Sequence, residues 1–359
     1  MGEFRAKANR GVARPTTVAP TLRAFYDAYF DLIAEGISPT TAEDYRIVIT
    51  GQLLPYFGNT RITEITAGAV NVWLREVKKR RRAQDKPPLS GATLNGYANI
   101  LRLLVNYAVT FDVIDESPFK KPIAREKVHL PKNELSDDER TAFLRAFDDR
   151  EAFIAHLRAR HHTGRVVACE RYPTPRSFGG SRRWDSAAAE ELWLRFRALR
   201  PFFVGALTTG LRLGDLCQLR WEHIRWSEGW IQLTMQKTQR EVTIPIAAAC
   251  EAALHECHAR PVVGELVFVD EVGSPLSVTR IRRTFALAKM LAGITRRVRI
   301  HDLRHTYGSS LASDGLSLAI IGKVMGHADQ ATTARYARPD NRVLEAVRQS
   351  VDRRHVPVK

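Results

Sequence analysis

The chain has 359 residues, 44% of them hydrophobic, and its 55 Lys and Arg outnumber its 39 Asp and Glu, giving a formal net charge of +16. This length corresponds to about two domains. Such an excess of basic residues is typical of proteins that neutralise nucleic-acid phosphates. No apolar run approaches the roughly 20 residues that span a bilayer, and residues 1–20 lack the apolar core of a signal peptide. These features argue against a membrane-spanning or secreted protein and predict a cytoplasmic one.

The cysteines give no indication of a metal site. They are Cys169, Cys217, Cys250 and Cys257, and none forms a C-x-x-C pair. His161, His162 and Cys169 lie close together in the sequence, but no fourth ligand has a spacing typical of zinc. We expect buried free thiols, and no metal or other cofactor.

The N-terminal third is expected to form a helical bundle. Residues 1–20 are basic and contain two prolines, as in a flexible arm. From 21 to 115, apolar residues recur at helical spacing in about four segments. The expected N-caps in this region are Thr40, in capping-box spacing with Glu43, then Thr66 and Ser90.

One of these helices ends in a basic run. The run consists of Lys78, Lys79, Arg80, Arg81 and Arg82. Such runs are usually solvated helix faces. With a net charge of +16, this one is also a candidate for DNA binding through phosphate contacts, which raise affinity without selecting a sequence.

The second half begins after a Pro-rich, basic stretch, 116–134, that predicts a linker. Ser136 and Glu139 form a capping-box pattern at the start of the next domain. Residues 150–195 show no clean period and predict a loop-rich insertion. Apolar residues alternate over 231–246, which predicts a β-hairpin with its turn near Lys237–Arg240. The expected fold is therefore mainly α with a small β-hairpin or sheet.

Three C-terminal segments contain several side chains that could take part in catalysis. "TTGLRLGDL" contains Arg212, and "TTARYA" contains Tyr336. Between them, "HDLRHTYGSSLASDGLSLAIIGKVMGH" contains His301, Arg304 and His327. His301 and Arg304 are three positions apart and so share a helix face.

The stretch between Arg304 and His327 predicts a second helix. Its inward-packing residues are expected to be Leu316, Ile320, Ile321 and Val324. Gly326 then lets the chain turn, and His327 follows at once.

These residue types suit chemistry at a phosphodiester. Two guanidiniums can bind the equatorial oxygens of a pentacoordinate phosphorus. Imidazoles can donate hydrogen bonds or move protons, and a tyrosine oxygen can act as the nucleophile. A lysine at a hairpin tip can protonate the departing 5′ oxygen. No Asp/Glu cluster with metal spacing accompanies the set, which argues against a two-metal nuclease.

Together, these segments resemble the catalytic domain of the tyrosine recombinases, the phage integrase family. The order Arg, Lys, His-x-x-Arg, His, Tyr is that of the family. The steps of 23 residues from Arg304 to His327 and nine from His327 to Tyr336 also fit its pattern. The resemblance covers about 200–340, and the bundle at 21–115 is similar to the family's core-binding domain.

The resemblance implies a role for each residue of the set. Arg212 and Arg304 would bind the scissile phosphate, Lys237 would be the general acid, His301 would assist as acid or base, His327 would hydrogen-bond the phosphate, and Tyr336 would form a 3′-phosphotyrosyl bond. Asp215 matches an acidic position that orients these groups. The implied reaction is site-specific DNA cleavage and rejoining without metal or ATP, in integration, excision or resolution of a phage or mobile element.

The resemblance also implies an organisation. Residues 1–20 would be an arm, 21–115 the core-binding domain, 116–134 a linker, 135–340 the catalytic domain, and 341–359 a C-terminal helix and tail. The two domains would form a clamp on double-stranded DNA, with four protomers on two sites. Residues 341–350, which carry Val343, Leu344 and Val347 at helical spacing, would dock on a neighbouring protomer. Accessory DNA-bending proteins are candidate partners.

Two features depart from the family pattern, and several alternatives stay open. The region 150–195 is longer than the family minimum, and residues 1–20 are too short for an arm-site-binding domain. Arg240 is an alternative to Lys237. Tyr307 is expected to fill the core, and His305 to be structural or to support the catalytic residues from behind. A type IB topoisomerase and a non-enzymatic DNA-binding protein are the competing functions.

Overall fold

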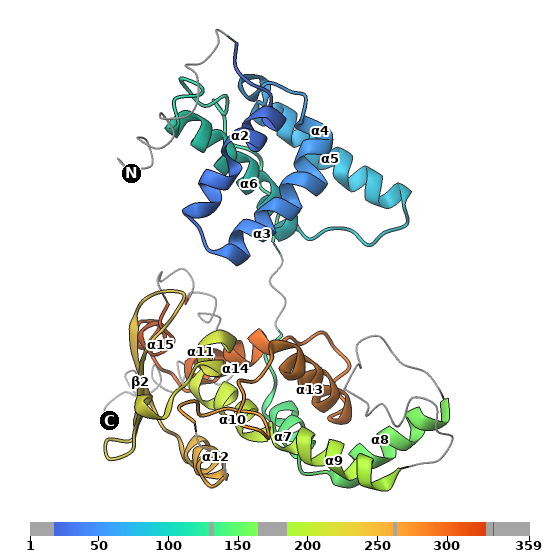
Figure 1. The fold of residues 1–359 in the computed structure, drawn as a ribbon, viewed down its shortest axis with the longest axis vertical. Helices are drawn as coiled ribbons and strands as arrows, with labels where there is room; N and C mark the ends of the chain where they lie inside the picture. The colour runs from blue at the N-terminus through green and yellow to red at the C-terminus, as the bar shows by residue number, and fades with distance from the viewer. Residues whose placement is uncertain (1–17, 129–132, 164–184, 261–263, 328–332, 334–359) are drawn as a thin grey trace, which may run out of the picture. The chain divides into compact units, whose positions relative to one another are not determined.

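The computed structural model describes residues 18–128, 133–163, 185–260, 264–327 and 333. The chain divides into two compact units, Met1–Pro131 and Lys132–Lys359 (Figure 1). Among the described residues, no helix is long and apolar enough to cross a membrane.

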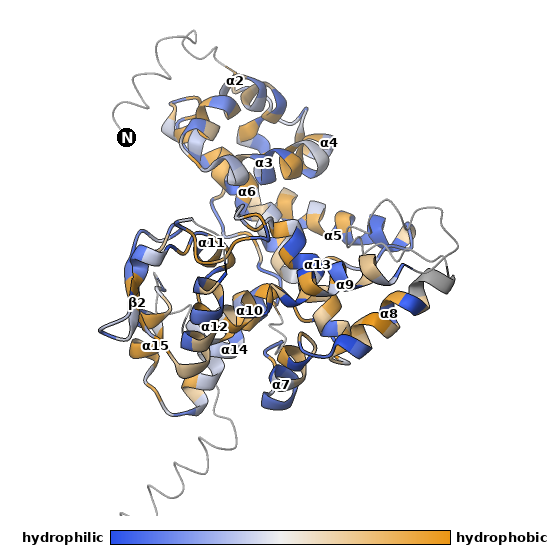
Figure 2. Cartoon of the chain, turned by 60° about the horizontal axis from the view of Figure 1, so that its bottom comes forward, coloured by the Kyte–Doolittle hydropathy of each residue, from blue (hydrophilic) through white to orange (hydrophobic). Residues whose placement is uncertain are grey.

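The first unit is a helical bundle. Its elements are α2 (Leu22–Glu35), α3 (Pro39–Val48), a π-helical turn (Ile49–Leu53), α4 (Leu54–Phe57), a 3₁₀ turn (Ile62–Glu64), α5 (Ala67–Ala83) and α6 (Gly91–Thr110). Each long helix turns an apolar face inward, and Phe25, Phe57 and Trp73 are the largest fully buried side chains. Hydrophobic and hydrophilic residues alternate along these helices (Figure 2), as expected for amphipathic helices around one core.

Two of the three N-caps predicted from the sequence of this unit are present. Thr66 caps α5 and Ser90 caps α6, each accepting a backbone N–H through its side chain. The expected capping box at Thr40 is wrong, because Ser38 caps α3 instead, accepting from the Thr41 N–H at 3.3 Å. Pro39 explains the difference, since proline fits the first helical position and so sets the helix start before Thr40.

Part of the segment expected to be a linker packs on the first unit. Ile123 is buried in its core. The Asn95 side chain donates to the Glu126 carbonyl at 3.0 Å and accepts from the Glu126 N–H at 2.9 Å. Residues up to Glu126 are therefore fixed to α6, and the two units divide at Pro131.

The second unit surrounds α10 (Arg200–Thr209), which is buried on nearly all sides. The other helices are α7 (Asp137–Arg145), α8 (Arg150–Thr163), α9 (Ser186–Arg197), α11 (Leu213–Cys217), α12 (Ala248–His258), α13 (Val278–Leu291), α14 (Ile300–Ser313) and α15 (Leu318–Val324). Helices α7, α11, α12 and α14 contact α10. The predicted capping box of Ser136 and Glu139 is present at α7.

A three-stranded antiparallel sheet lies in the same unit. Its strands are β1 (Ile224–Arg225), β2 (Trp230–Thr234) and β3 (Glu241–Pro245), in that order. Ile231 pairs with Ile244 and Leu233 with Val242, and all four are buried. The alternation in the sequence therefore predicted the hairpin correctly, with residues 235–240 connecting its strands.

The region expected to be a loop-rich insertion contains two helices that contact each other, α8 and α9. Phe153 and Leu157 of α8 and Leu192 and Trp193 of α9 are buried in the main core. In α8, the charged residues Arg150, Glu151 and Arg158 occupy exposed positions and hide the helical period in the sequence. Residues 164–184 lie outside the described part of the chain.

Helix α15 packs differently from the prediction. Ile321 is fully buried and Val324 half-buried, as expected, but Leu316 is 38% exposed and Ile320 50% exposed. The helix begins only at Leu318, after its N-cap Ser317. Leu316 therefore precedes the helix, and Ile320 lies on its outer face.

The described cysteines are free and buried, as predicted. Burial raises the pKa of the Cys217 and Cys257 thiols to about 11 and also raises the pKa of Cys250. Cys169 lies outside the described residues.

Candidate functional site

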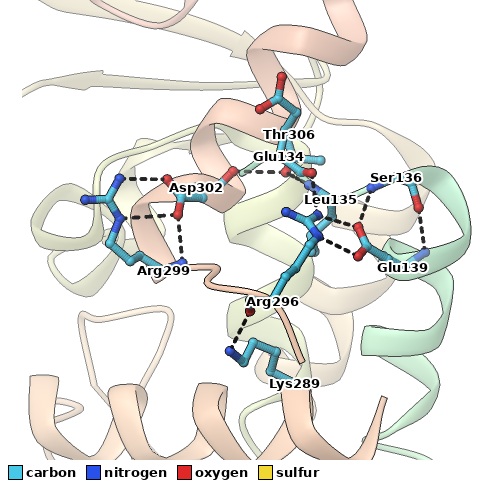
Figure 3. Close-up of polar contacts among 9 residues, drawn as sticks. All are labelled: Glu134, Leu135, Ser136, Glu139, Lys289, Arg296, Arg299, Asp302 and Thr306. Atoms are coloured by element: carbon cyan, nitrogen blue, oxygen red, sulfur yellow. Dashed lines mark hydrogen bonds and ion pairs between the residues drawn. The ribbon is translucent and has the colours of Figure 1, made fainter. Parts of the chain in front are cut away.

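Helix α14 carries His301 and Arg304, and a polar network holds its first turns in place (Figure 3). The Arg299 N–H donates to Asp302 Oδ2 at 2.8 Å, in a capping box that starts the helix. The Thr306 hydroxyl donates to the Asp302 carbonyl at 2.9 Å and accepts from the Leu135 N–H at 2.9 Å. The helix is thereby bound to the segment that precedes α7.

An ion pair connects the first turn of α7 to the loop before α14. Arg296 Nε donates to Glu139 Oε1 at 2.8 Å, and Arg296 Nη2 donates to the Glu134 carbonyl at 2.7 Å. Lys289 Nζ donates to the Arg296 carbonyl at 3.0 Å (Figure 3). The hydrogen bond from Arg296 is the main reason that the pKa of Glu139 lies below its ordinary value.

Arg304 is 3% exposed and contacts two distant segments. Its Nη1 donates to the Gly210 carbonyl, and its Nη2 donates to the Met325 carbonyl. A buried guanidinium needs such acceptors because removing its charge from water is costly. Arg304 thus fixes the turn after α10 and the end of α15 around α14.

Arg212 lies two residues after Gly210, at the N-cap of α11. It is half-buried, and its Nη1 donates to Met235 Sδ at 3.3 Å. The approach of the two segments depends on Gly210, which has φ +62°. A Cβ at Gly210 would lie 2.3 Å from Cδ1 of Tyr307, so only glycine fits there.

Asp215, in the first turn of α11, is 3% exposed. Its Oδ1 accepts from the Gln236 N–H at 2.9 Å. Among the described residues its Oδ2 is a buried oxygen without a hydrogen-bond partner. The carboxylate therefore connects α11 to the start of the hairpin turn.

His301 is exposed and stands edge-on to the buried His305, with ring centroids 4.7 Å apart. Arg304 and His301 line one small pocket together with Leu213 and Leu216 of α11. The prediction that His301 and Arg304 share a helix face is consistent with this pocket.

Lys237 lies exposed in the turn of the β2–β3 hairpin, as the sequence predicted. Its side chain makes no ion pair or hydrogen bond within the described part of the chain. Arg240, the alternative basic residue of the hairpin, instead donates from Nη1 to the His327 carbonyl at 2.8 Å.

His327 is 7% exposed and follows α15 through Gly326, which turns the chain at φ +61°. Its N–H donates to the Gly322 carbonyl at 2.9 Å, and its Nδ1 is 2.8 Å from the hydroxyl of the buried Thr333. Thr333 thus anchors the chain three residues before Tyr336. Tyr336 itself, and residues 341–350, lie outside the described residues.

The described contacts bring five predicted residues into one region of the second unit. They are Arg212, Asp215, Lys237, Arg304 and His327, and His301 lies on the same helix as Arg304. The basic run lies in the other unit. The sequence did not indicate Met235, Gln236 and Thr333, because a thioether, a main-chain N–H and a hydroxyl that act as contacts leave no spacing signature.

This arrangement concentrates positive charge and hydrogen-bond donors around α14. Two guanidiniums, two imidazoles and an ammonium group suit a phosphate ester better than any neutral ligand. Among the described residues, no group of three His, Cys, Asp or Glu side chains could hold a metal ion.

Comparison with known proteins finds a family match in each of the two units. Residues 189–342 match the phage integrase family, and residues 21–78 match the N-terminal SAM-like domain of phage integrases. Tyrosine recombinase XerC of Xylella fastidiosa (strain M23) is 31% identical over 158 residues, which are 44% of this chain and 52% of that protein. The chain thus spans about half the length of the curated relatives it matches.

Several solved structures share the fold. The Tn1549 transposon integrase in complex with transposon right end DNA has a TM-score of 0.66 and 16% identity, covering 92% of this chain and 99% of that one. A lambda integrase tetramer bound to a Holliday junction has a TM-score of 0.61 and 19% identity, covering 91% and 79%. The chain belongs to the tyrosine recombinase, or phage integrase, family.

Proposed function

We propose that the protein is a site-specific DNA recombinase that cleaves and rejoins DNA through Tyr336. The observation that carries this proposal is the pair of hydrogen bonds from the buried Arg304 to the carbonyls of Gly210 and Met325. They bring the segments of Arg212 and His327 to one helix, as a phosphate-binding centre requires.

The proposed reaction conserves the number of phosphodiester bonds. The Tyr336 hydroxyl gives its proton to His301 as its oxygen attacks the scissile phosphorus, the bond to the 5′ oxygen breaks, and a 3′-phosphotyrosyl bond forms. Lys237 gives its proton to the departing 5′ oxygen. A 5′ hydroxyl from a partner strand then attacks the phosphotyrosine and releases Tyr336, so rejoining needs neither ATP nor a metal.

The remaining side chains stabilise or transfer charge. Arg212 and Arg304 bind the phosphate oxygens as negative charge develops on them. His327 donates a hydrogen bond to the phosphate, and His301, exposed on α14, assists as acid or base. Asp215 orients the hairpin through Gln236.

DNA contact involves both units in this proposal, with the core-binding domain at 21–115 and the catalytic domain at 135–340. Four protomers act on two sites. The lambda integrase tetramer bound to a Holliday junction, which shares the fold, supports this assembly. Residues 341–350 dock on a neighbouring protomer, so a chain truncated after Pro339 should bind DNA but fail to recombine paired sites.

The test is recombination of DNA that flanks the gene. Purified protein and two copies of the flanking DNA, with EDTA and without ATP, should give recombinant products and cleavage at fixed positions. Relaxation of any supercoiled plasmid, independent of sequence and of paired sites, would instead indicate a type IB topoisomerase. DNA binding without any cleavage would indicate a non-enzymatic protein.

A further inference from the structure

The turn between β2 and β3 touches several candidate catalytic segments. At its start, Met235 Sδ accepts from Arg212 Nη1 at 3.3 Å, and the Gln236 N–H donates to Asp215 Oδ1 at 2.9 Å. At its end, Arg240 Nη1 donates to the His327 carbonyl at 2.8 Å. Lys237 lies between these attachments.

The turn at Gly326 and His327 packs closely on the same hairpin. A Cβ at Gly326 would lie 2.2 Å from Met235 Sδ and 2.9 Å from Val242 Cγ1. The Thr238 hydroxyl is also 3.5 Å from the Gly326 carbonyl, at the limit of a hydrogen bond. The absence of a side chain at Gly326 therefore allows Arg240 to reach the next carbonyl.

We propose that Arg240 is a positioning residue that acts through Lys237. By binding the His327 carbonyl, it holds the hairpin turn against the segment that leads to Tyr336, so that Lys237 reaches the leaving oxygen. This inference rests on the proposed recombinase function.

The hairpin turn needs such an attachment because its own main-chain hydrogen bonds only close the turn on itself. Two main-chain hydrogen bonds close the turn, from the Met235 N–H to the Arg240 carbonyl and from the Gln239 N–H to the Met235 carbonyl, both at 2.8 Å. Gln239 adopts φ +51°, which a side chain tolerates poorly. A charged donor on a neutral carbonyl is a strong hydrogen bond, and proton transfer needs the acid within about 3 Å of the reacting oxygen.

A direct DNA contact is the competing role for an exposed arginine. That role predicts weaker DNA binding, whereas positioning predicts slower cleavage in the bound state. Arg225 is the matched control, because it is exposed on β1 of the same sheet and its side chain makes no hydrogen bond or ion pair among the described residues.

The first experiment measures single-turnover cleavage of a nicked duplex carrying the mapped site. Arg240→Met should slow cleavage about 10- to 100-fold, the usual effect of small misplacement, while its DNA affinity matches that of Arg225→Met. Arg240→Lys retains a donor and should recover much of the rate. Weaker binding with a wild-type cleavage rate would overturn the inference.

The second experiment separates Lys237 from the other groups. Adding Arg240→Met to Lys237→Ala should cause no further slowing. A substrate with sulfur in place of the bridging 5′ oxygen should restore both single variants, because the P–S bond breaks to a thiolate that needs no proton. Independent effects of the two substitutions, or an Arg240→Met defect that persists with the sulfur substrate, would overturn the inference.

The third experiment does not depend on cleavage. Hydrogen exchange of the amides at 235–242 should accelerate in Arg240→Met and stay unchanged in Arg225→Met. A wild-type protein that forms no DNA adduct refutes the proposed function. A wild-type protein that forms it, with unchanged exchange and cleavage in Arg240→Met, refutes only the role of Arg240.

Discussion

The guanidinium of Arg304 donates a hydrogen bond to the carbonyl of Gly210, two residues before Arg212. The two arginines of the site are therefore connected through the main chain. One of them is nearly inaccessible, and the other is half-buried at a helix N-cap. This difference in environment predicts different consequences for their removal.

Arg304→Ala should lower both stability and activity. It leaves the buried carbonyls of Gly210 and Met325 without their donor, at a cost of about 1–3 kcal/mol each. Arg212→Ala should lower the free energy of unfolding by less than about 1 kcal/mol. Each should reduce the cleavage rate about 10²- to 10³-fold. Urea unfolding and single-turnover cleavage measure the two effects, and equal stability losses would contradict the contacts described.

Gly210→Ala should destabilise the second unit more than Gly293→Ala. Both glycines have positive φ, +62° and +70°, so both variants bear the same conformational cost of about 1–2 kcal/mol. Only at Gly210 would the new Cβ collide with a side chain, the ring of Tyr307. Thermal unfolding of both variants tests this, and indistinguishable melting temperatures would show that the Tyr307 contact is unimportant.

The ion pair of Glu139 and Arg296 should make stability depend on acid pH. Since the pKa of Glu139 is lowered from 4.5 in the folded protein, its contribution is present above pH 4.5 and is lost as the pH falls through the folded value. The melting temperature of Glu139→Gln should therefore lie below that of the wild type at pH 7, and the gap should narrow below pH 4.5.

A control for this pH dependence is Glu265→Gln. Glu265 pairs with Arg220, but its side chain is 78% exposed, and exposed pairs contribute little. This variant should melt close to the wild type at neutral pH. If the melting temperature of Glu139→Gln lay below that of the wild type by the same amount from neutral to acid pH, the ion pair would not be the cause of the difference.

The basic run should contribute to DNA affinity through its exposed members, Lys79, Arg80 and Arg82. Lys78 is bound to Glu126 at 2.6 Å, and Arg81 Nε donates to the Pro87 carbonyl at 2.9 Å. Replacing the three exposed residues by Met should weaken binding to all DNA sequences alike. The slope of log affinity against log salt concentration should also become shallower, by about 0.9 for each DNA phosphate that is no longer neutralised.

The control for the basic run is Lys78→Met, which removes one charge already paired with a carboxylate. It should change the salt dependence of binding less than Lys79→Met does. An affinity loss confined to one DNA sequence would mean that the run reads bases rather than phosphates.

Features with a local cause could be predicted from the sequence. Alternating Ile231, Leu233, Val242 and Ile244 predicted the hairpin because every second side chain in a strand faces the core. Thr66, Ser90 and Ser136 predicted helix starts because a cap acts on its own first turn.

Features that depend on tertiary contacts could not be predicted. The Arg304 and Arg240 hydrogen bonds end on carbonyls of Gly210, Met325 and His327, and every residue has a carbonyl. In α8, charged residues at exposed positions concealed the helical period. Leu316 is exposed because α15 begins only after it, and Ile320 is exposed because it lies on the outer face of that helix. Hydrophobicity alone determines neither.

The most direct measurement of the central claim is trapping of a protein–DNA adduct on a nicked duplex from which the cleaved end is lost. The wild type and Tyr307→Phe should accumulate a covalent 3′-phosphotyrosyl complex that survives denaturation, with the modified peptide containing Tyr336. Tyr336→Phe should bind the same DNA with unchanged affinity and form no adduct. An adduct that persists in Tyr336→Phe, or that maps to another residue, would contradict the account.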